Sequence, residues 1–162
     1  MNLGELTRRF RVLAKDAVEP YFWSDEDIAA WMTDAQAQAC IRGRLLREDE
    51  SEAMCRIDLD PNTQKYKLHR ALYELISVRI KPPIAPSRPL KPVTREWRDA
   101  EMPDWRDSTR PVLWAIQDET SLRLVGTIAP GEKLWLEGYR LPLRDLEGET
   151  DEPEIHRASH EH

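Results

Sequence analysis

The chain has 162 residues, 33% of them charged, and a formal net charge of −6 at pH 7. This length is typical of one domain, alone or with a small insertion. The acidic balance argues against a DNA-binding domain, because affinity for phosphates comes largely from Lys and Arg.

The first 50 residues are predicted to form a pair of packed helices. Apolar residues recur at spacings of three and four from Leu3 to Ala17, which predicts a helix that ends before Pro20. A second helix is expected to start at its cap, Ser24, and to run to about Leu46. Its predicted apolar face consists of Ile28, Trp31, Met32, Ala35 and Ala39. The alanines permit close packing against a helix of the same chain or of a neighbouring subunit.

Basic residues follow the other face of the first predicted helix. They are Arg8, Arg9, Arg11 and Lys15. A face of this kind is usually solvated, and contact with an acidic partner is the alternative.

Short strands are expected from residue 51 onward. The pattern favours strands over 53–59, 66–68 and 74–80, with a helix as the alternative for the last, and a turn over 60–63. The proline-rich segment 81–92 is expected to be a stiff connector or an edge segment, with no helix or sheet of its own. Thr94 is a possible helix start.

Three apolar runs separated by turn residues follow between Arg110 and Pro142, which predicts an antiparallel meander. Leucines at 122, 124, 134 and 136 alternate with other residues, as one buried face requires. The predicted fold is therefore α+β, with a helical pair joined to a small antiparallel β-sandwich or meander. The expected regions are 1–50 (helical), 51–146 (β-rich) and 147–162 (a C-terminal arm).

No motif for catalysis, metal binding or cofactor binding is found. Asp58 begins a stretch like a calcium loop, but its sixth position is Thr63 and its twelfth is His69, so a β-turn is expected. His156 and His160 have the spacing of helical metal ligands but no apolar surroundings. We therefore expect no enzyme, no metal and no cofactor.

Two cysteines, Cys40 and Cys55, are too few for a disulfide framework and are expected to be thiols of a reducing compartment. No apolar run approaches the length of a membrane span, and charges occupy the place of a signal peptide's apolar run. We therefore expect a protein that is made in the cytoplasm and makes no membrane contact.

The tryptophans have two interpretations. Trp97, Trp105, Trp114 and Trp135 could form a stacking platform for a glycan or a peptide, which would make the chain a β-sandwich binding module. Core packing and subunit contact are the commoner roles of tryptophan.

Five stretches carry a resemblance to a known family. They are LGELTRRFRVL (3–13), YFWSDEDI (21–28), WMTDAQAQA (31–39), the apolar runs of 110–142 and DEPEIH (151–156). In order and spacing they resemble the small adaptor proteins of tailed bacteriophages, which lie beneath the portal ring in the head–tail connector. Relatives continue past the position of His156 into a further helix, whereas this sequence ends at His162, so nothing about that helix is carried over.

The resemblance implies a structural virion protein at the head–tail junction, assembled in the host cytoplasm. Twelve copies would form a ring that docks on the portal, attaches a tail or nozzle protein and extends the channel. DNA would pass without specific binding, because an acidic wall repels phosphates. We expect Trp105, Arg110 and Trp114 near subunit contacts. The expected portal contacts are Glu154, Ile155, His156 and Arg157.

Overall fold

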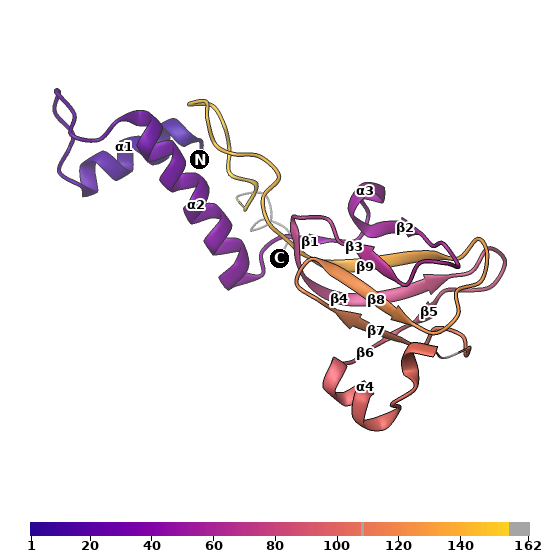
Figure 1. Ribbon diagram of the computed structural model, residues 1–162. Helices are drawn as coiled ribbons and strands as arrows, with labels where there is room; N and C mark the ends of the chain where they lie inside the picture. Colours follow the sequence, from indigo (N-terminus) through magenta and orange to yellow (C-terminus); the bar gives the residue numbers. More distant parts are fainter. Residues whose placement is uncertain (108, 156–162) are drawn as a thin grey trace. The chain divides into compact units, whose positions relative to one another are not determined.

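The computed structural model describes residues 1–107 and 109–155, which form two compact units (Figure 1). The helical unit comprises residues 1–46 and the described residues 140–155, and the β unit comprises residues 47–139. The fold is α+β, as the sequence predicts.

Two capped helices build the helical unit. Helix α1 spans Leu3–Leu13 and begins with a capping box, in which Asn2 and Glu5 each accept the other's backbone N–H. Helix α2 spans Asp25–Gly43, and Ser24 Oγ accepts the N–H of Asp27 at 3.1 Å. The rings of Phe10 and Trp31 lie 5.8 Å apart between the helices. The predicted pair and the Ser24 cap are confirmed.

Helix α1 is shorter than predicted. It ends at Leu13, whose side chain is 84% exposed, and Lys15 has a positive φ of 58°. The predicted apolar stripe to Ala17 is wrong beyond Phe10, because the connection to α2 is organised by polar contacts of Arg11 and Asp16 instead. The face expected for α2 is also partly wrong, since Ile28 is buried whereas Trp31 and Ala35 are exposed. Helix α2 ends at Gly43, before the expected Leu46.

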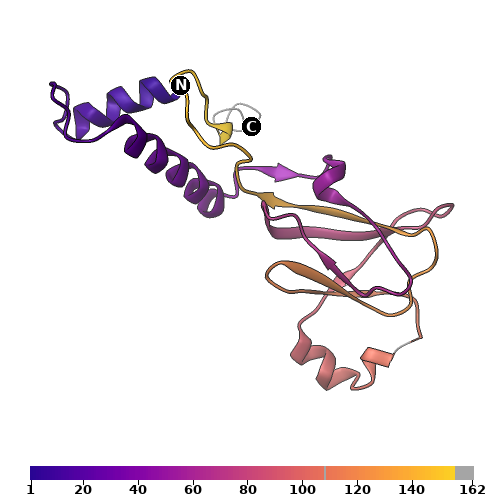
Figure 2. The same cartoon turned by 45° about the horizontal axis from the view of Figure 1, so that its top comes forward.

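Residues 146–154 fold back on both helices (Figure 2). On α1, the N–H groups of Leu3 and Gly4 donate to the carbonyls of Asp151 and Glu149 at 2.8 and 2.9 Å. On α2, the N–H of Leu146 donates to Thr33 Oγ1 at 2.9 Å. The segment supplies acceptors to the start of α1, where backbone N–H groups lack helical partners.

The β unit is a sandwich of two sheets. In the first, the order is β1 (Arg47–Glu48), β9 (Lys133–Arg140), β4 (Leu72–Lys81) and β5 (Arg88–Pro89), and β2 (Arg56–Asp58) also pairs with β9. In the second, the order is β3 (Lys65–Lys67), β8 (Ser121–Val125), β7 (Trp114–Gln117) and β6 (Lys91–Pro92). Short helices α3 (Glu52–Cys55), α4 (Arg95–Glu101) and η1 (Trp105–Asp107) connect the strands.

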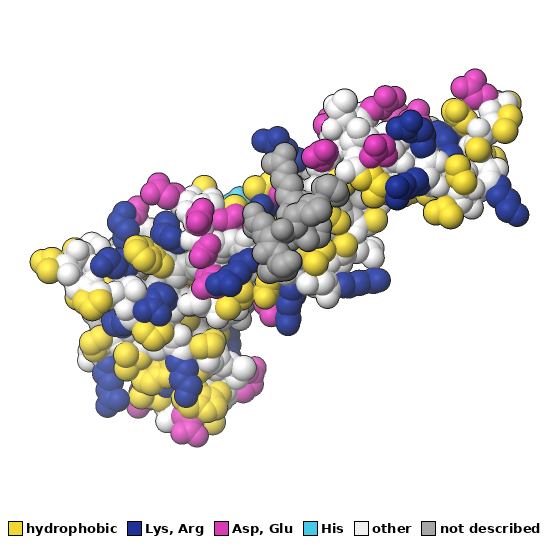
Figure 3. All heavy atoms as spheres, turned by 180° about the vertical axis from the view of Figure 1, so that it is seen from behind, with side chains coloured by type: hydrophobic (Ala, Val, Ile, Leu, Met, Phe, Trp, Pro, Cys, Tyr) yellow, Lys and Arg dark blue, Asp and Glu magenta, His cyan; other side chains and the backbone are white. Residues whose placement is uncertain are grey.

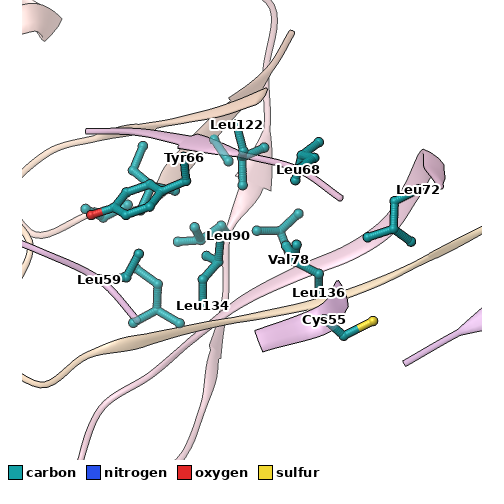
Figure 4. Close-up of a cluster of buried hydrophobic side chains, with 14 of the residues drawn as sticks. Cys55, Leu59, Tyr66, Leu68, Leu72, Val78, Leu90, Leu122, Leu134 and Leu136 are labelled. Atoms are coloured by element: carbon teal, nitrogen blue, oxygen red, sulfur yellow. The ribbon is translucent and has the colours of Figure 1, made fainter. Parts of the chain in front are cut away.

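The core lies between the two sheets (Figure 4). Side chains of Leu134 and Leu136 from one sheet face Tyr66 and Leu122 from the other. Leu122, Leu124, Leu134 and Leu136 are each at most 2% exposed. The predicted alternation on these strands is confirmed.

Three strand predictions need correction. The expected meander is wrong at its third strand, because β9 joins β1, β2 and β4 rather than the hairpin of β7 and β8. The expected strand over 53–59 begins as helix α3 and becomes extended only at Arg56. The proline-rich segment forms β5 and β6, which confirms an edge position but not the absence of sheet structure.

Other local predictions are confirmed. The segment around 74–80 is the strand β4 rather than a helix, and Tyr66 lies in β3. The turn at 60–63 is closed by the N–H of Thr63, which donates to the carbonyl of Asp60 at 3.0 Å. Thr94 caps α4 by accepting the N–H of Trp97.

Both thiols are expected to be unreactive in the folded protein. Cys40 and Cys55 are 0% exposed, and burial raises both pKa values, that of Cys55 from 9.0 to about 11. At pH 8 we expect a thiol-specific disulfide reagent to label both cysteines slowly in buffer and rapidly in urea. Because the folded pKa of Cys55 is raised, its contribution to stability is full below pH 9 and declines between about pH 9 and 11. Fast labelling in buffer would contradict this burial.

Candidate assembly surfaces

Trp105 is a core residue of the β unit. Its side chain is 2% exposed and packs with Ile116 and Val125. Its indole Nε1 donates to Asp99 Oδ1 at 2.7 Å, and this bond, with a second from Arg106, lowers the pKa of Asp99. Within one chain Trp105 therefore fixes the position of α4 and η1 against the sheet.

Trp114 lies under a buried arginine. The guanidinium of Arg98 is 4.2 Å from the centroid of the Trp114 ring, and Arg98 is 1% exposed. Arg98 Nη2 lies 3.0 Å from Met102 Sδ, while its buried Nε has no hydrogen-bond partner among residues 1–107 and 109–155. The guanidinium is therefore held mainly by aromatic faces, a favourable arrangement for a desolvated cation.

Cationic side chains lie near the tryptophans that could form a stacking platform. Besides the Arg98–Trp114 pair, the guanidinium of Arg56 lies 4.7 Å from the centroid of Trp135. Trp97 is 40% exposed and has Lys91 and Arg98 near its ring. These contacts stabilise the β unit, and a role of the tryptophans in binding a glycan or a peptide stays a prediction.

Arg110 is the exposed member of the predicted subunit-contact set. Its carbonyl accepts the N–H of Thr127 at 2.7 Å, beside an isolated bridge between Pro111 and Thr127. The structure places Trp105 and Trp114 in one cluster and Arg110 on the chain between them. Contact of these residues with a neighbouring subunit stays a prediction.

Glu154 joins three parts of the helical unit. Its carboxylate pairs with Arg140 Nη1 at 2.7 Å and accepts the N–H of Leu143 at 2.6 Å. Its own N–H donates to Gln36 Oε1 on α2, also at 2.6 Å. The predicted portal contacts thus begin at a residue with intramolecular partners. Ile155 is half-buried, and His156 and Arg157 lie outside the described residues.

A buried arginine organises the connection between α1 and α2. Arg11 is 5% exposed, so its expected place on a solvated face is wrong. Its guanidinium pairs with Asp16 at 2.7 Å and Asp25 at 2.6 Å and stacks 3.8 Å from the Tyr21 ring centroid. The sequence signal was weak, because Asp16 is one of two acids, with Glu19, in the short connection that precedes the aromatic run.

Asp16 holds the other side of this connection. Its carboxylate accepts the N–H of Phe22 at 2.7 Å and that of Trp23 at 3.2 Å. These two bonds, together with the guanidinium of Arg11, lower the pKa of Asp16 below its ordinary 3.8. Arg11 and Asp16 together therefore fix both the end of α1 and the start of the aromatic run.

Replacing Asp16 by asparagine should make the stability of the helical unit change less between pH 7 and pH 3. A lowered folded pKa gives stabilisation that is present above pH 3.8 and is lost as the pH falls through the folded value. We expect Asp16→Asn to be less stable than wild type at pH 7 and the difference to shrink by pH 3. Urea melts followed by tryptophan fluorescence at both pH values measure this, with the exposed Asp145→Asn as control. An unchanged difference at pH 3 would contradict the ionic role of Asp16.

Two kinds of feature are absent from residues 1–107 and 109–155 of the structure. No three His, Cys, Asp or Glu side chains of this part are grouped to hold a metal ion. Its helices are also too short or too polar to cross a membrane.

Comparison with known proteins gives one family. The family model described as SU10 adaptor protein matches residues 1–160. A comparison with curated proteins finds no match. The family match covers both units and agrees with the order of motifs in the sequence, so the chain belongs to the SU10 adaptor protein family and is a structural adaptor of a bacteriophage.

Proposed function

We propose that the chain is a head–tail adaptor, of which twelve copies form a ring beneath the portal and attach a tail or nozzle protein. The observation that carries this proposal is the family match over residues 1–160. The ring would extend the DNA channel through which the genome leaves the particle. A ring needs a heterologous interface, in which two different surfaces of the same chain meet.

Exposed apolar side chains support an assembling protein. In the helical unit, Val18 and Phe22 are 80% and 78% exposed, and in the β unit Ile84 is 99% exposed. Apolar side chains gathered on a surface mark contact sites, because water is released when a partner covers them. The helical unit thus offers an apolar surface to a neighbouring protein.

The net charge suits a conduit for DNA. A charge of −6 per chain, repeated around a ring, gives a strongly acidic assembly that repels phosphates. DNA is therefore expected to pass without specific binding, and the role of the protein is structural rather than enzymatic.

The C-terminal arm, residues 147–162, is proposed to reach the portal. The contacts of residues 146–154 with α1 and α2 would hold the root of the arm, and Glu154 would fix the point from which it leaves the helical unit. The β-unit residues Trp105, Arg110 and Trp114 are proposed to lie near the subunit contact, where Trp105 would shape the surface and Arg110 would reach it.

A test of the arm follows from these contacts. Truncation after Leu146 would remove hydrogen bonds that stabilise the helical unit, whereas truncation after Ile155 leaves them intact. The protein ending at Ile155 should therefore fold normally but co-sediment poorly with purified portal rings. Co-sedimentation equal to that of the full chain would contradict a portal contact through His156 and Arg157.

A further inference from the structure

One buried cation of the β unit has no acidic partner. Arg98 lies on α4 and is 1% exposed. In the part of the chain that the structure describes, its guanidinium makes one hydrogen-bond contact, with Nη2 3.0 Å from Met102 Sδ, and its buried Nε makes none. The acid next to it in the sequence, Asp99, pairs with Arg106 instead, at 3.0 Å. Arg98 is therefore a desolvated charge without a counter-charge.

Such a placement does not maximise the stability of the β unit. A guanidinium that leaves water loses its hydration, and a carboxylate or a full set of hydrogen bonds is needed to offset that loss. The two tryptophan rings near Arg98 offset only a part of it. An apolar side chain of similar volume in such a place is commonly neutral or stabilising. The benefit of Arg98 therefore lies in something other than the stability of the isolated β unit.

Arg98 contacts two tryptophans that belong to different elements. Its guanidinium carbon lies 4.2 Å from the centroid of the Trp114 ring on β7 and 5.7 Å from that of the Trp97 ring on α4. A planar guanidinium presents a fixed shape to aromatic rings, whereas the flexible chain of a methionine does not. Arg98 therefore determines how the two rings are placed relative to each other.

The two rings belong to a surface at the edge of the second sheet. The term edge surface is used here for Lys91, Trp97, Leu113 and Trp114. Lys91 on the edge strand β6 pairs in register with Trp114, and its N–H donates to the carbonyl of Leu113 at 2.9 Å. Trp97 and Leu113 are 40% and 46% exposed. Figure 3 shows hydrophobic side chains, in yellow, and basic side chains, in dark blue, next to one another over the end of the β unit that carries α4.

We propose that Arg98 is a positioning residue for the subunit contact of the ring. It acts through Trp97 and Trp114, which it holds in the arrangement that the neighbouring copy covers. Trp114 is already proposed to lie near that contact, and tryptophan is among the residue types that contribute most to interface energies. The inference rests on the proposed ring and adds a residue that acts without touching the neighbour.

Replacement of Arg98 by methionine separates this role from a structural one. Methionine fills a similar volume without a charge, so the urea midpoint of Arg98→Met should equal or exceed that of wild type. The amount of adaptor bound to purified portal rings should nevertheless fall by about tenfold or more, because the two rings lose their fixed arrangement. A clearly lower midpoint, which includes failure to fold, would show a structural role and overturn the proposal. Undiminished binding would overturn it as well.

Arg56 provides the matched control. Its guanidinium also lies over a tryptophan, 4.7 Å from the centroid of Trp135, but it donates to the carbonyls of Cys55 and Asp49 at 3.0 and 2.8 Å. Arg56→Met should therefore lower the urea midpoint and leave portal binding within about threefold of wild type. Equal losses of binding in both variants would mean that the loss of any arginine–tryptophan contact disturbs the ring, and the specific role of Arg98 would be overturned.

Photo-crosslinking identifies the protein that covers the edge surface. The photoreactive residue p-benzoylphenylalanine replaces Leu113, which is 46% exposed. On portal rings, irradiation should give adaptor–adaptor products, and their yield should fall by about tenfold when Arg98→Met is added. Products with the portal alone, or a yield that Arg98→Met leaves unchanged, would contradict a role of Arg98 in the subunit contact.

The wild-type sample separates the two levels of the account. If wild-type chain adds no ring to the portal, the proposed function fails together with the role of Arg98. If wild type forms the ring and Arg98→Met forms it equally well, only the role of Arg98 fails.

Discussion

Replacing Leu134 by alanine should lower the free energy of unfolding of the β unit by about 2–5 kcal/mol. Leu134 is 0% exposed and pairs in register with Ile57 on β2, within the core between the sheets. Alanine would remove buried methyl groups and leave a cavity that the neighbouring strands, tied to β9 by hydrogen bonds, close only in part. Urea unfolding followed by circular dichroism measures the change.

The control for Leu134 lies in the same unit. Ile84 is 99% exposed, so Ile84→Ala should change the free energy of unfolding by no more than about 0.5 kcal/mol. Equal effects of the two substitutions would mean that β9 does not line the core.

Replacing Gly138 by alanine should cost about 3 kcal/mol. A Cβ at this position would lie 2.5 Å from the carbonyl oxygen of Glu74 on β4, far inside van der Waals contact. Strand β9 cannot move away freely, because Gly138 pairs on its other side with Glu48 of β1. The clash must therefore be relieved by distorting the middle of the first sheet. Thermal unfolding of the variant measures the loss.

A second glycine provides the matched comparison for Gly138. At Gly148 a Cβ would meet only side-chain atoms of Asp151, at 3.5 Å or more, which is ordinary contact. Gly148→Ala is therefore expected to change stability by less than about 1 kcal/mol. If Gly138→Ala were as mild as Gly148→Ala, the close approach of β9 and β4 would be incorrect.

Local features of the fold could be predicted from the sequence. Ser24 and Thr94 begin helices because their hydroxyls accept backbone N–H groups three residues later in the chain. Such capping depends only on the local sequence. The alternation of leucines at 122 and 124, and at 134 and 136, follows from the twofold repeat of a strand. The family could be suggested as well, since its motifs extend through the chain.

Long-range pairings could not be predicted in the same way. Strand β9 has the same apolar pattern whether it pairs with β8 or with β4, so its place in the first sheet depends on the packing of the whole β unit. The end of α1 depends on Asp16 reaching the backbone of Phe22, a contact that its apolar spacing does not reveal. The burial of Arg11 could not be predicted for the same reason, because it depends on the contacts of Arg11 with Asp16 and Asp25.

The candidate assembly surfaces could likewise be predicted from the sequence only in part. The sequence suggested Trp105 and Trp114 as residues near a subunit contact, but their common cluster and the guanidinium of Arg98 over Trp114 required the structure. The basic residues of α1 and the acids of α2 were visible as charges, but the burial of Arg11 beside Asp16 and Asp25 required the structure.

The mass of the complex with the portal tests the account most directly. Purified chain is mixed with purified portal rings of the same virus, and native mass spectrometry measures the species formed. The account predicts a portal ring whose mass has increased by that of twelve chains. A portal of unchanged mass beside free adaptor would contradict the proposed function.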